Sequence, residues 1–206
     1  TGNGKYEVEV YPGYIKYKFR RDDGLEMQMT MFVAKENPME FWEINVENKT
    51  GREVDLEVAS FMKWAMGNQD PASEKATKVT YDSERGAYFA QSPKALSPDS
   101  VGFHTVIGDG LMVKPNNLFG SNDNPSHGLT TNLKVAAGES KRMSFVLGLG
   151  ENAANSKKYI EQYKTTRQVR NELNRHLKHI SSWMDGIQVK TPDKDFNTMS
   201  NTWLTY

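Results

Sequence analysis

The stretch Leu25-Glu26-Met27-Gln28-Met29-Thr30-Met31-Phe32-Val33 decides the fold class of this chain. Its odd positions are all apolar, and Glu26, Gln28 and Thr30 stand between them. Successive side chains of a β-strand point to opposite faces of the sheet, so a period of two indicates one buried and one wet face. The stretch therefore predicts a half-buried strand over residues 25–33.

The same alternation continues on both sides. Residues 15–19 alternate apolar with basic side chains, and the Asp-Gly turn at residues 21–24 joins them to the first strand as a hairpin. Further strands are expected at residues 42–46, 54–58, 78–81, 87–91, 101–107, 130–135 and 142–149. Gly, Pro, Asn and Ser separate them, as in antiparallel sandwiches. Residues 1–150 are therefore predicted to form a mainly β, antiparallel β-sandwich domain.

After Gly150 the pattern becomes helical. Asn155 or Ser156 is expected to cap a short helix that runs through Tyr163, and Thr165 and Gln168 have the spacing of a capping box. The apolar residues of the next segment recur every three or four positions: Val169, Leu173, Leu177, Ile180 and Met184. They predict an amphipathic helix that packs on the β domain or on a neighbouring chain. Residues 151–190 are interpreted as a helical linker.

A third helix is expected at the end of the sequence. Thr191 is its expected N-cap and Pro192 its first residue. Phe196, Met199 and Trp203 follow at helical spacing. Such an apolar stripe needs a partner, and no Gly, Lys or Arg closes the helix. We expect the helix within residues 191–206 to be cut off at Tyr206 and to belong to a longer chain.

The composition narrows the functional classes. The 206 residues include 26 Lys and Arg and 26 Asp and Glu, so the net charge is 0. This balance gives no overall attraction to nucleic acid or to an anionic membrane surface, and no apolar run reaches the roughly 18–20 residues of a membrane span. The absence of cysteine excludes disulfides and thiolate chemistry. With no signal-peptide pattern at the first residues, we expect a cytoplasmic protein without nucleic-acid or membrane partners.

No group of residues has the spacing of a known catalytic or metal site. The four histidines are His104, His127, His176 and His179. None has metal-ligand spacing, and the last two are expected on a solvated helix surface. The carboxylates of residues 43–47 and 53–57 alternate along strands, which favours solvent-facing positions over a catalytic pair. We predict no catalytic residue, no metal and no cofactor.

Two short motifs have ordinary structural explanations. Gly148-Leu149-Gly150 lacks the third glycine of a dinucleotide-binding loop and is interpreted as a strand end. Asn48-Lys49-Thr50 matches a glycosylation sequon but is most simply a turn.

Aromatic side chains are the remaining candidates for ligand contact, because exposed rings can stack on sugar faces. Trp64 stands where a strand ends and a Gly-Asn-Gln-Asp loop begins, so it is expected to be an accessible platform. Trp42 shares a strand face with apolar residues and is expected in the core. Tyr88 and Phe103 are further candidates, although such rings are more often buried.

Residues 38–64 have a pattern known from one enzyme family. They run PMEFWEINVENKTGREVDLEVASFMKW. Three further segments match in the same order: Tyr11-Pro12-Gly13-Tyr14, residues 147–152, and residues 187–193 leading to residues 201–206. With these segments, nearly the whole chain resembles the N-terminal part of the cellobiose and chitobiose phosphorylases, glycoside hydrolase family 94, formerly glycosyltransferase family 36.

The resemblance implies a β-supersandwich, then linker helices, then, at residues 191–206, the start of a truncated catalytic (α/α)6 barrel, with an N-terminal family segment missing from this sequence. In such enzymes inorganic phosphate cleaves a β-linked disaccharide with inversion, while a carboxylic acid in the barrel protonates the glycosidic oxygen. The resemblance puts that acid and the phosphate site outside residues 1–206. The chain alone is therefore expected to be inactive.

The resemblance also implies a homodimer in which loops of the β domain reach the neighbour's active site. The family commonly has Asn-Phe-Gln-Arg after the strand that ends near Trp64, whereas this sequence has Gly67-Asn68-Gln69-Asp70-Pro71. The candidate carbohydrate contacts are Trp64, Asn68, Gln69, Tyr88 and Phe103.

The predicted function is that of a noncatalytic β-sandwich domain of an inverting disaccharide or oligosaccharide phosphorylase. Its partners would be β-linked glucosides or related sugars, inorganic phosphate in the full-length enzyme, and a second subunit. Two alternatives remain: an autonomous carbohydrate-binding module, and a purely structural assembly domain. A change of tryptophan emission with sugar would favour the first alternative, and dimerisation without any sugar response would favour the second.

Overall fold

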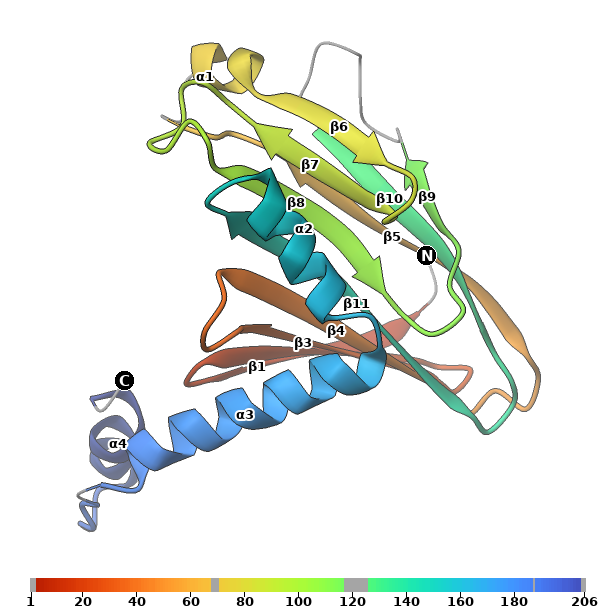
Figure 1. Cartoon of the computed structure of the whole chain (residues 1–206). Helices are drawn as coiled ribbons and strands as arrows, with labels where there is room; N and C mark the ends of the chain where they lie inside the picture. The colour runs from red at the N-terminus through yellow and green to blue at the C-terminus, as the bar shows by residue number, and fades with distance from the viewer. Residues whose placement is uncertain (1–2, 68–70, 117–125, 187, 205–206) are drawn as a thin grey trace.

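The computed structural model describes residues 3–67, 71–116, 126–186 and 188–204. Its strands form two antiparallel sheets (Figure 1). The large sheet has the order β1 (Gly4–Tyr11), β2 (Tyr14–Arg21), β3 (Leu25–Val33), β4 (Met39–Asn48), β11 (Ser140–Gly150), β8 (Val101–Ile107), β7 (Ala87–Gln91) and β6 (Lys78–Asp82). The small sheet has the order β5 (Val54–Lys63), β10 (Ser126–Val135) and β9 (Val113–Asn116). The mainly β sandwich is confirmed.

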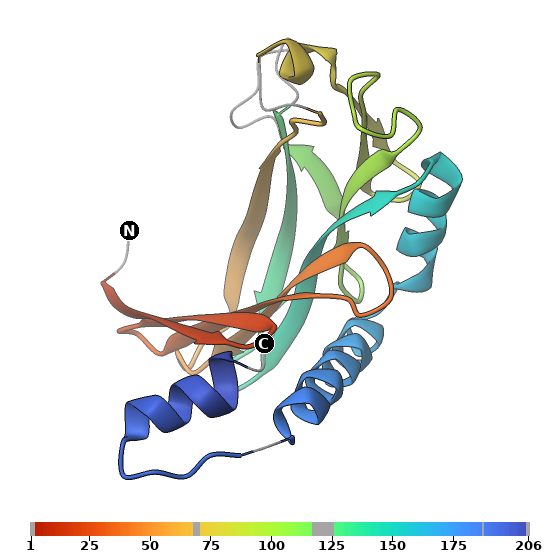
Figure 2. The same cartoon turned by 90° about the vertical axis from the view of Figure 1, so that its left-hand side faces the viewer.

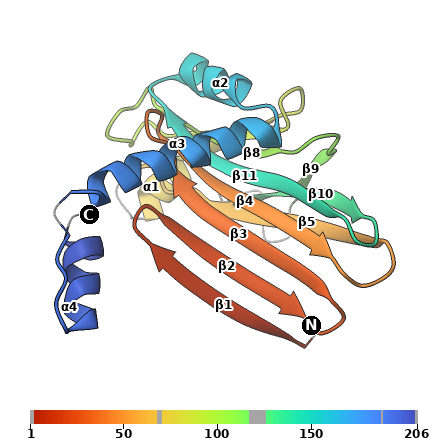
Figure 3. The same ribbon diagram turned by 90° about the horizontal axis from the view of Figure 1, so that it is seen from below.

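The helices are α1 (Pro71–Ala76), α2 (Ala153–Gln162), α3 (Thr166–Met184) and α4 (Lys194–Thr198), and α4 continues into a π-helical turn, η1 (Met199–Trp203). Helix α3 crosses one face of the large sheet, as Figure 3 shows from below. None of the helices in the described ranges is long and apolar enough to span a membrane.

The strands β3, β7 and β8 have the predicted bounds. The alternation along a strand shows which of its residues share a face, but it does not show which sheet the strand joins. The structure places β5 in the small sheet, and it adds β1, β9 and α1, which are not among the elements predicted from the sequence.

Strand β4 is buried on both faces because α2 and α3 cover one face of the large sheet there and the small sheet covers the other. Phe41 faces a core shared with α2 and α3, whereas Ile44 and Val46 face the core between the two sheets. The expectation that Glu43 faces solvent is wrong: its side chain is 3% exposed, and Arg170 Nε of α3 lies 3.1 Å from its carboxylate. Burial raises the pKa of Glu43, and Arg170 opposes that rise. Trp42, expected in the core, is half-buried.

The helix caps differ from prediction at two of three positions. Asn152 caps α2, because its side chain accepts a hydrogen bond from the backbone N–H of Asn155. Ser156 instead donates to the Val101 carbonyl inside the core, at 2.6 Å. Asp193 caps α4 in place of Thr191, since its carboxylate accepts two backbone N–H groups.

The capping box of Thr165 and Gln168 at the start of α3 is confirmed. Val169, Leu173 and Ile180 are buried against the sheet, so the predicted amphipathic helix packs on the β domain. His176 was expected on a solvated surface, and this is wrong: it is 8% exposed, and His179 is half-buried.

Besides the ion pair of Arg170 with Glu43, helix α3 makes polar contacts through the buried side chain of Glu172. One of its oxygens accepts the Lys35 backbone N–H at 3.3 Å, and the other accepts the Tyr163 hydroxyl at 2.8 Å. Since a buried carboxylate without partners would be costly, these contacts fix where the helix meets the sheet.

Candidate functional site

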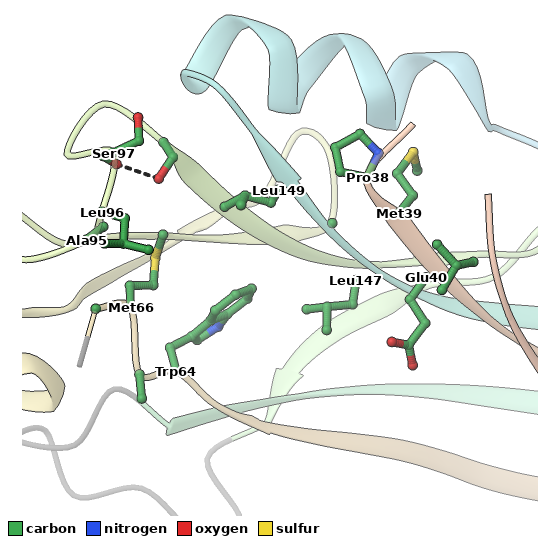
Figure 4. Close-up of a pocket in the computed structure, with 15 residues that line it drawn as sticks. Pro38, Met39, Glu40, Trp64, Met66, Ala95, Leu96, Ser97, Leu147 and Leu149 are labelled. Carbon is green, nitrogen blue, oxygen red and sulfur yellow. Dashed lines mark hydrogen bonds between the residues drawn. The ribbon is translucent and has the colours of Figure 1, made fainter. Parts of the chain in front are cut away.

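A cavity of about 580 Å³ opens at the end of the sandwich where β5 stops. It is formed by the connection between β3 and β4, the residues after β5, the loop after β7, and β11. Its apolar lining includes Met39, Trp64, Met66, Leu96, Leu147 and Leu149. Figure 4 shows the Trp64 indole between Met66 and Leu147.

Two glycines make this arrangement possible. A Cβ atom on Gly102 of β8 would lie 2.5 Å from Trp64 Cζ3, so only glycine lets the indole lie against that strand. Gly67 has φ +122°, and a Cβ atom there would lie 2.5 Å from the Lys94 carbonyl oxygen. The segment after β5 can therefore pass close to the loop after β7.

The polar groups of the cavity are few. Glu40 is the only ionisable side chain among its described lining residues, and its carboxylate accepts the Trp42 indole N–H. Ser100 donates its hydroxyl to the Ser97 carbonyl at 2.6 Å. Cleavage of a glycosidic bond by paired carboxylates needs two such groups, so this lining suits binding and offers no catalytic pair.

A buried hydrogen-bonded chain lies behind Trp64, between the two sheets. The Ser60 hydroxyl lies 3.1 Å from His104 Nε2, and His104 Nδ1 lies 3.0 Å from His127 Nε2. The His127 ring is nearly parallel to that of Trp64, with centroids 6.2 Å apart. Burial lowers the pKa of His104 to about 3 and that of His127 to about 4, and His127 adds to the shift at His104. Both imidazoles are therefore neutral near pH 7.

The sequence analysis did not predict this series of hydrogen-bonded side chains. Ser60, His104 and His127 lie on β5, β8 and β10, and only the packing of one sheet on the other brings them together. Across the described ranges, no group of three or more His, Cys, Asp or Glu residues could hold a metal ion.

The five candidate carbohydrate contacts differ in how accessible they are in the structure. Trp64 is half-buried and lines the cavity. Tyr88 is 7% exposed, with its ring 4.0 Å from that of His127, and Phe103 is fully enclosed beside Gly148. Neither of these two rings offers a free face to a sugar, because core residues already cover them. Asn68 and Gln69 lie outside the described residues.

A family model and relatives found by sequence comparison show what this chain is similar to. The model of the Glycosyl hydrolase 94, supersandwich domain, matches residues 1–114. The cyclic beta-(1,2)-glucan synthase NdvB of Rhizobium meliloti is 22% identical over 98% of this chain and 8% of that protein. The N,N'-diacetylchitobiose phosphorylase of Vibrio proteolyticus is 20% identical over 97% of this chain and 28% of that protein.

Among solved structures, a protein from the human microbiome described as a kojibiose phosphorylase aligns with a TM-score of 0.46 and 10% identity, over 98% of this chain and 25% of that one. The chain thus spans less than a third of each of these relatives. The family model covers more than half of the chain, and its supersandwich description agrees with the two packed sheets. The chain belongs to the glycosyl hydrolase 94 family, whose noncatalytic supersandwich domain it contains.

Proposed function

We propose that this chain is the β-sandwich domain and linker of an inverting disaccharide or oligosaccharide phosphorylase, in which it helps to shape the sugar site and the dimer. The observation that carries the proposal is the Trp64 cavity, which lies at the end of a family supersandwich and has Gly67 in its lining. The apolar face of a sugar ring can pack on an indole, while Glu40 can accept hydrogen bonds from sugar hydroxyls.

The C-terminal helices support a role beside a further domain. Asn197 exchanges hydrogen bonds with the backbone of Thr191, and Asn201 does the same with Val189, so α4 and η1 are fastened to an extended segment. Phe196 and Met199, on the same unit, are 51% and 52% exposed. A preformed helical unit with exposed apolar residues is suited to pack against other helices.

The names of these two sequence relatives refer to carbohydrates, N,N'-diacetylchitobiose in one and a cyclic β-(1,2)-glucan in the other. We therefore propose β-linked sugars as ligands, with inorganic phosphate as the second substrate of a full-length cytoplasmic homodimeric enzyme.

The test is a titration of the chain with cellobiose, laminaribiose, sophorose and N,N'-diacetylchitobiose, followed by tryptophan emission and calorimetry. We expect Trp64→Ala to abolish the response and Trp183→Ala to keep it, since Trp183 is a half-exposed tryptophan on α3 that does not line the cavity. A response that survives in Trp64→Ala contradicts the assigned site. No sugar response in a chain that dimerises with concentration favours a purely structural assembly domain.

A further inference from the structure

A second cavity, of about 750 Å³, lies at the opposite end of the sandwich from the Trp64 cavity and is called here the basic cavity. Asp55, near the start of β5, lines it, whereas Trp64 follows the end of the same strand. On β11, Ser140 lines the basic cavity and Leu149 lines the other one. Figure 2 shows β5 and β11 rising from the lower end of the sandwich toward the end where α1 lies. At a rise of about 3.3 Å per residue, β5 separates the two cavities by roughly 30 Å.

Basic side chains from both sheets line this cavity. All four are exposed: Lys114 of β9, Lys134 of β10, and Lys141 and Arg142 of β11. Among its described lining residues only Asp55 and Asp109 are acidic, so the cavity has an excess of two positive charges. The chain as a whole has a net charge of 0, so positive charge is concentrated here.

Both carboxylates of the basic cavity already have partners. Asp55 accepts a hydrogen bond from the Asn132 amide at 3.5 Å and lies 3.7 Å from Lys134 Nζ. Asp109 accepts the Thr166 hydroxyl at 2.9 Å. Within the described ranges, the other three basic side chains of the cavity form no ion pair. Cations that are gathered in a concave site without counter-charges attract an anion.

The charged groups fit a phosphate ester. The Arg142 guanidinium can donate to two phosphate oxygens at once, and the lysine ammonium groups add positive charge around them. A phosphate monoester carries about −1.5 to −2 charges near pH 7, which is close to the positive excess of the cavity.

The uncharged lining fits the body of a sugar. Leu111 is half-buried and Met112 is 76% exposed, so both can pack against the apolar face of a ring. Asn132 and Ser140 can exchange hydrogen bonds with hydroxyl groups. The described lining holds no aromatic side chain on which a nucleobase could stack, which favours a sugar phosphate over a nucleotide.

We propose that the basic cavity binds a phosphate monoester of a sugar. Its volume of about 750 Å³ lies in the range of small-molecule sites, and a concave site favours a compact ligand over a flat macromolecular surface. The site is separate from the function proposed above, because it shares no lining residue with the Trp64 cavity.

The test is an NMR titration of the nitrogen-15-labelled chain with glucose 6-phosphate, with glucose and inorganic phosphate as parallel probes. The backbone signals of Lys114, Lys134 and Arg142 should shift with glucose 6-phosphate, while the indole N–H signal of Trp64 should stay. Glucose should leave the signals of the basic cavity unchanged, because it carries no charge. Inorganic phosphate should bind about fivefold more weakly, because it has no ring to pack on Met112.

Charge variants locate the ligand. The double variant Lys114→Gln with Lys141→Gln should weaken binding of glucose 6-phosphate about tenfold. Its control is Lys157→Gln with Lys158→Gln, which changes the net charge equally at two exposed positions of α2 and should keep the affinity. Asp55→Asn should strengthen binding about threefold, because it removes a negative charge from the cavity. Unchanged signals in the rest of the spectrum show that each variant is folded.

Equal affinities in the two double variants overturn the proposal, as does weaker binding in Asp55→Asn. Inorganic phosphate that binds as tightly as glucose 6-phosphate overturns the assignment to a sugar phosphate. Shifts confined to the residues around Trp64 also overturn the proposal, because the ligand then occupies the other cavity. A failed titration with neutral disaccharides has no bearing on this result, since the two sites are followed at different residues.

Discussion

His176 Nε2 in α3 donates a hydrogen bond to the carbonyl oxygen of Gly13, in the turn between β1 and β2, over 2.7 Å. The two residues are 163 positions apart in the sequence. Gly13 has φ +78°, and a Cβ atom there would lie 2.6 Å from the same nitrogen. The turn thus needs glycine both for its backbone conformation and for the approach of the imidazole.

We expect Gly13→Ala to destabilise the protein more than Gly51→Ala. Both glycines have positive φ, but a Cβ atom at Gly51 would meet nothing within 4 Å. Gly51→Ala should cost about 1–2 kcal/mol from backbone strain. Gly13→Ala should cost about 1–3 kcal/mol more, from the clash with His176. Urea unfolding measures both, and equal losses would show that α3 does not press on this turn.

Helix α3 should depend on Leu173. Its side chain is 3% exposed in the core beneath the helix, so Leu173→Ala should lower the free energy of unfolding by about 2–5 kcal/mol. Asn174→Ala, at the exposed neighbour, should change it by less than about 0.5 kcal/mol. If Leu173→Ala also fell within that small range, α3 would be a free linker in solution.

The side chain of Asn48 should stabilise the packing of the two sheets, because it bonds a strand of one sheet to a strand of the other. Its side chain is fully buried at the end of β4, and its amide donates to the carbonyls of Arg52 and Val135 at 2.7 and 2.8 Å. Its Oδ1 accepts from the Thr50 N–H, which confirms the predicted turn. Asn48→Ala should destabilise by about 2–4 kcal/mol, since it leaves buried carbonyls unpaired.

The control for Asn48 is Asn132→Ala, at an exposed position of β10. It should be nearly neutral in the same denaturation experiment. Similar losses at Asn48 and Asn132 would contradict the role of Asn48 between the sheets.

Stability should fall as the pH drops below about 6.5. The pKa of His104 is lowered to about 3 and that of His127 to about 4 in the folded chain, so the unfolded chain binds more protons below its own imidazole pKa. The contribution is fully present above pH 6.5 and decreases down to the folded values. At pH 5 each imidazole should account for about 2 kcal/mol.

Urea unfolding at pH 7 and pH 5 gives this difference. His127→Gln should reduce it, and His179→Gln, at a half-buried position on α3, should not. A pH dependence that is the same in both variants would assign the loss to other groups.

The chain alone should release no sugar 1-phosphate from cellobiose, laminaribiose, sophorose or chitobiose with phosphate. Inverting phosphorolysis needs an acid at the leaving oxygen and donors that hold phosphate behind the anomeric carbon. The Trp64 cavity offers one ionisable lining residue, Glu40, in the part that the structure describes. Chromatography measures the product.

Turnover that persists through repurification would contradict this expectation. Turnover lost in Asp109→Asn would then identify a loop carboxylate as its source. In the structure Asp109 accepts a hydrogen bond from the Thr166 hydroxyl at 2.9 Å.

The local periodicities determined most of the secondary structure. Residues 25–33 alternate so regularly that the strand and its bounds follow from the sequence, and the Thr165 capping box fixes the start of α3. Interactions between neighbouring residues decide such features, so no knowledge of distant contacts is needed. The family resemblance depended in the same way on the order of local motifs along the chain.

Only the tertiary structure decided what happens where distant segments meet. Glu43 and His176 have the sequence context of surface residues, yet both are buried. Helix α3 covers Glu43 on the large sheet, and His176, on α3 itself, faces the turn between β1 and β2. Tyr88 and Phe103 were predicted as possible sugar contacts, but in the folded chain their side chains are 7% and 0% exposed. Trp64 follows the end of β5, lies against Gly102 and lines a cavity. Burial is the sum of contacts from several strands and helices, so the period of one segment predicts which side chains share a face but not which face another element covers.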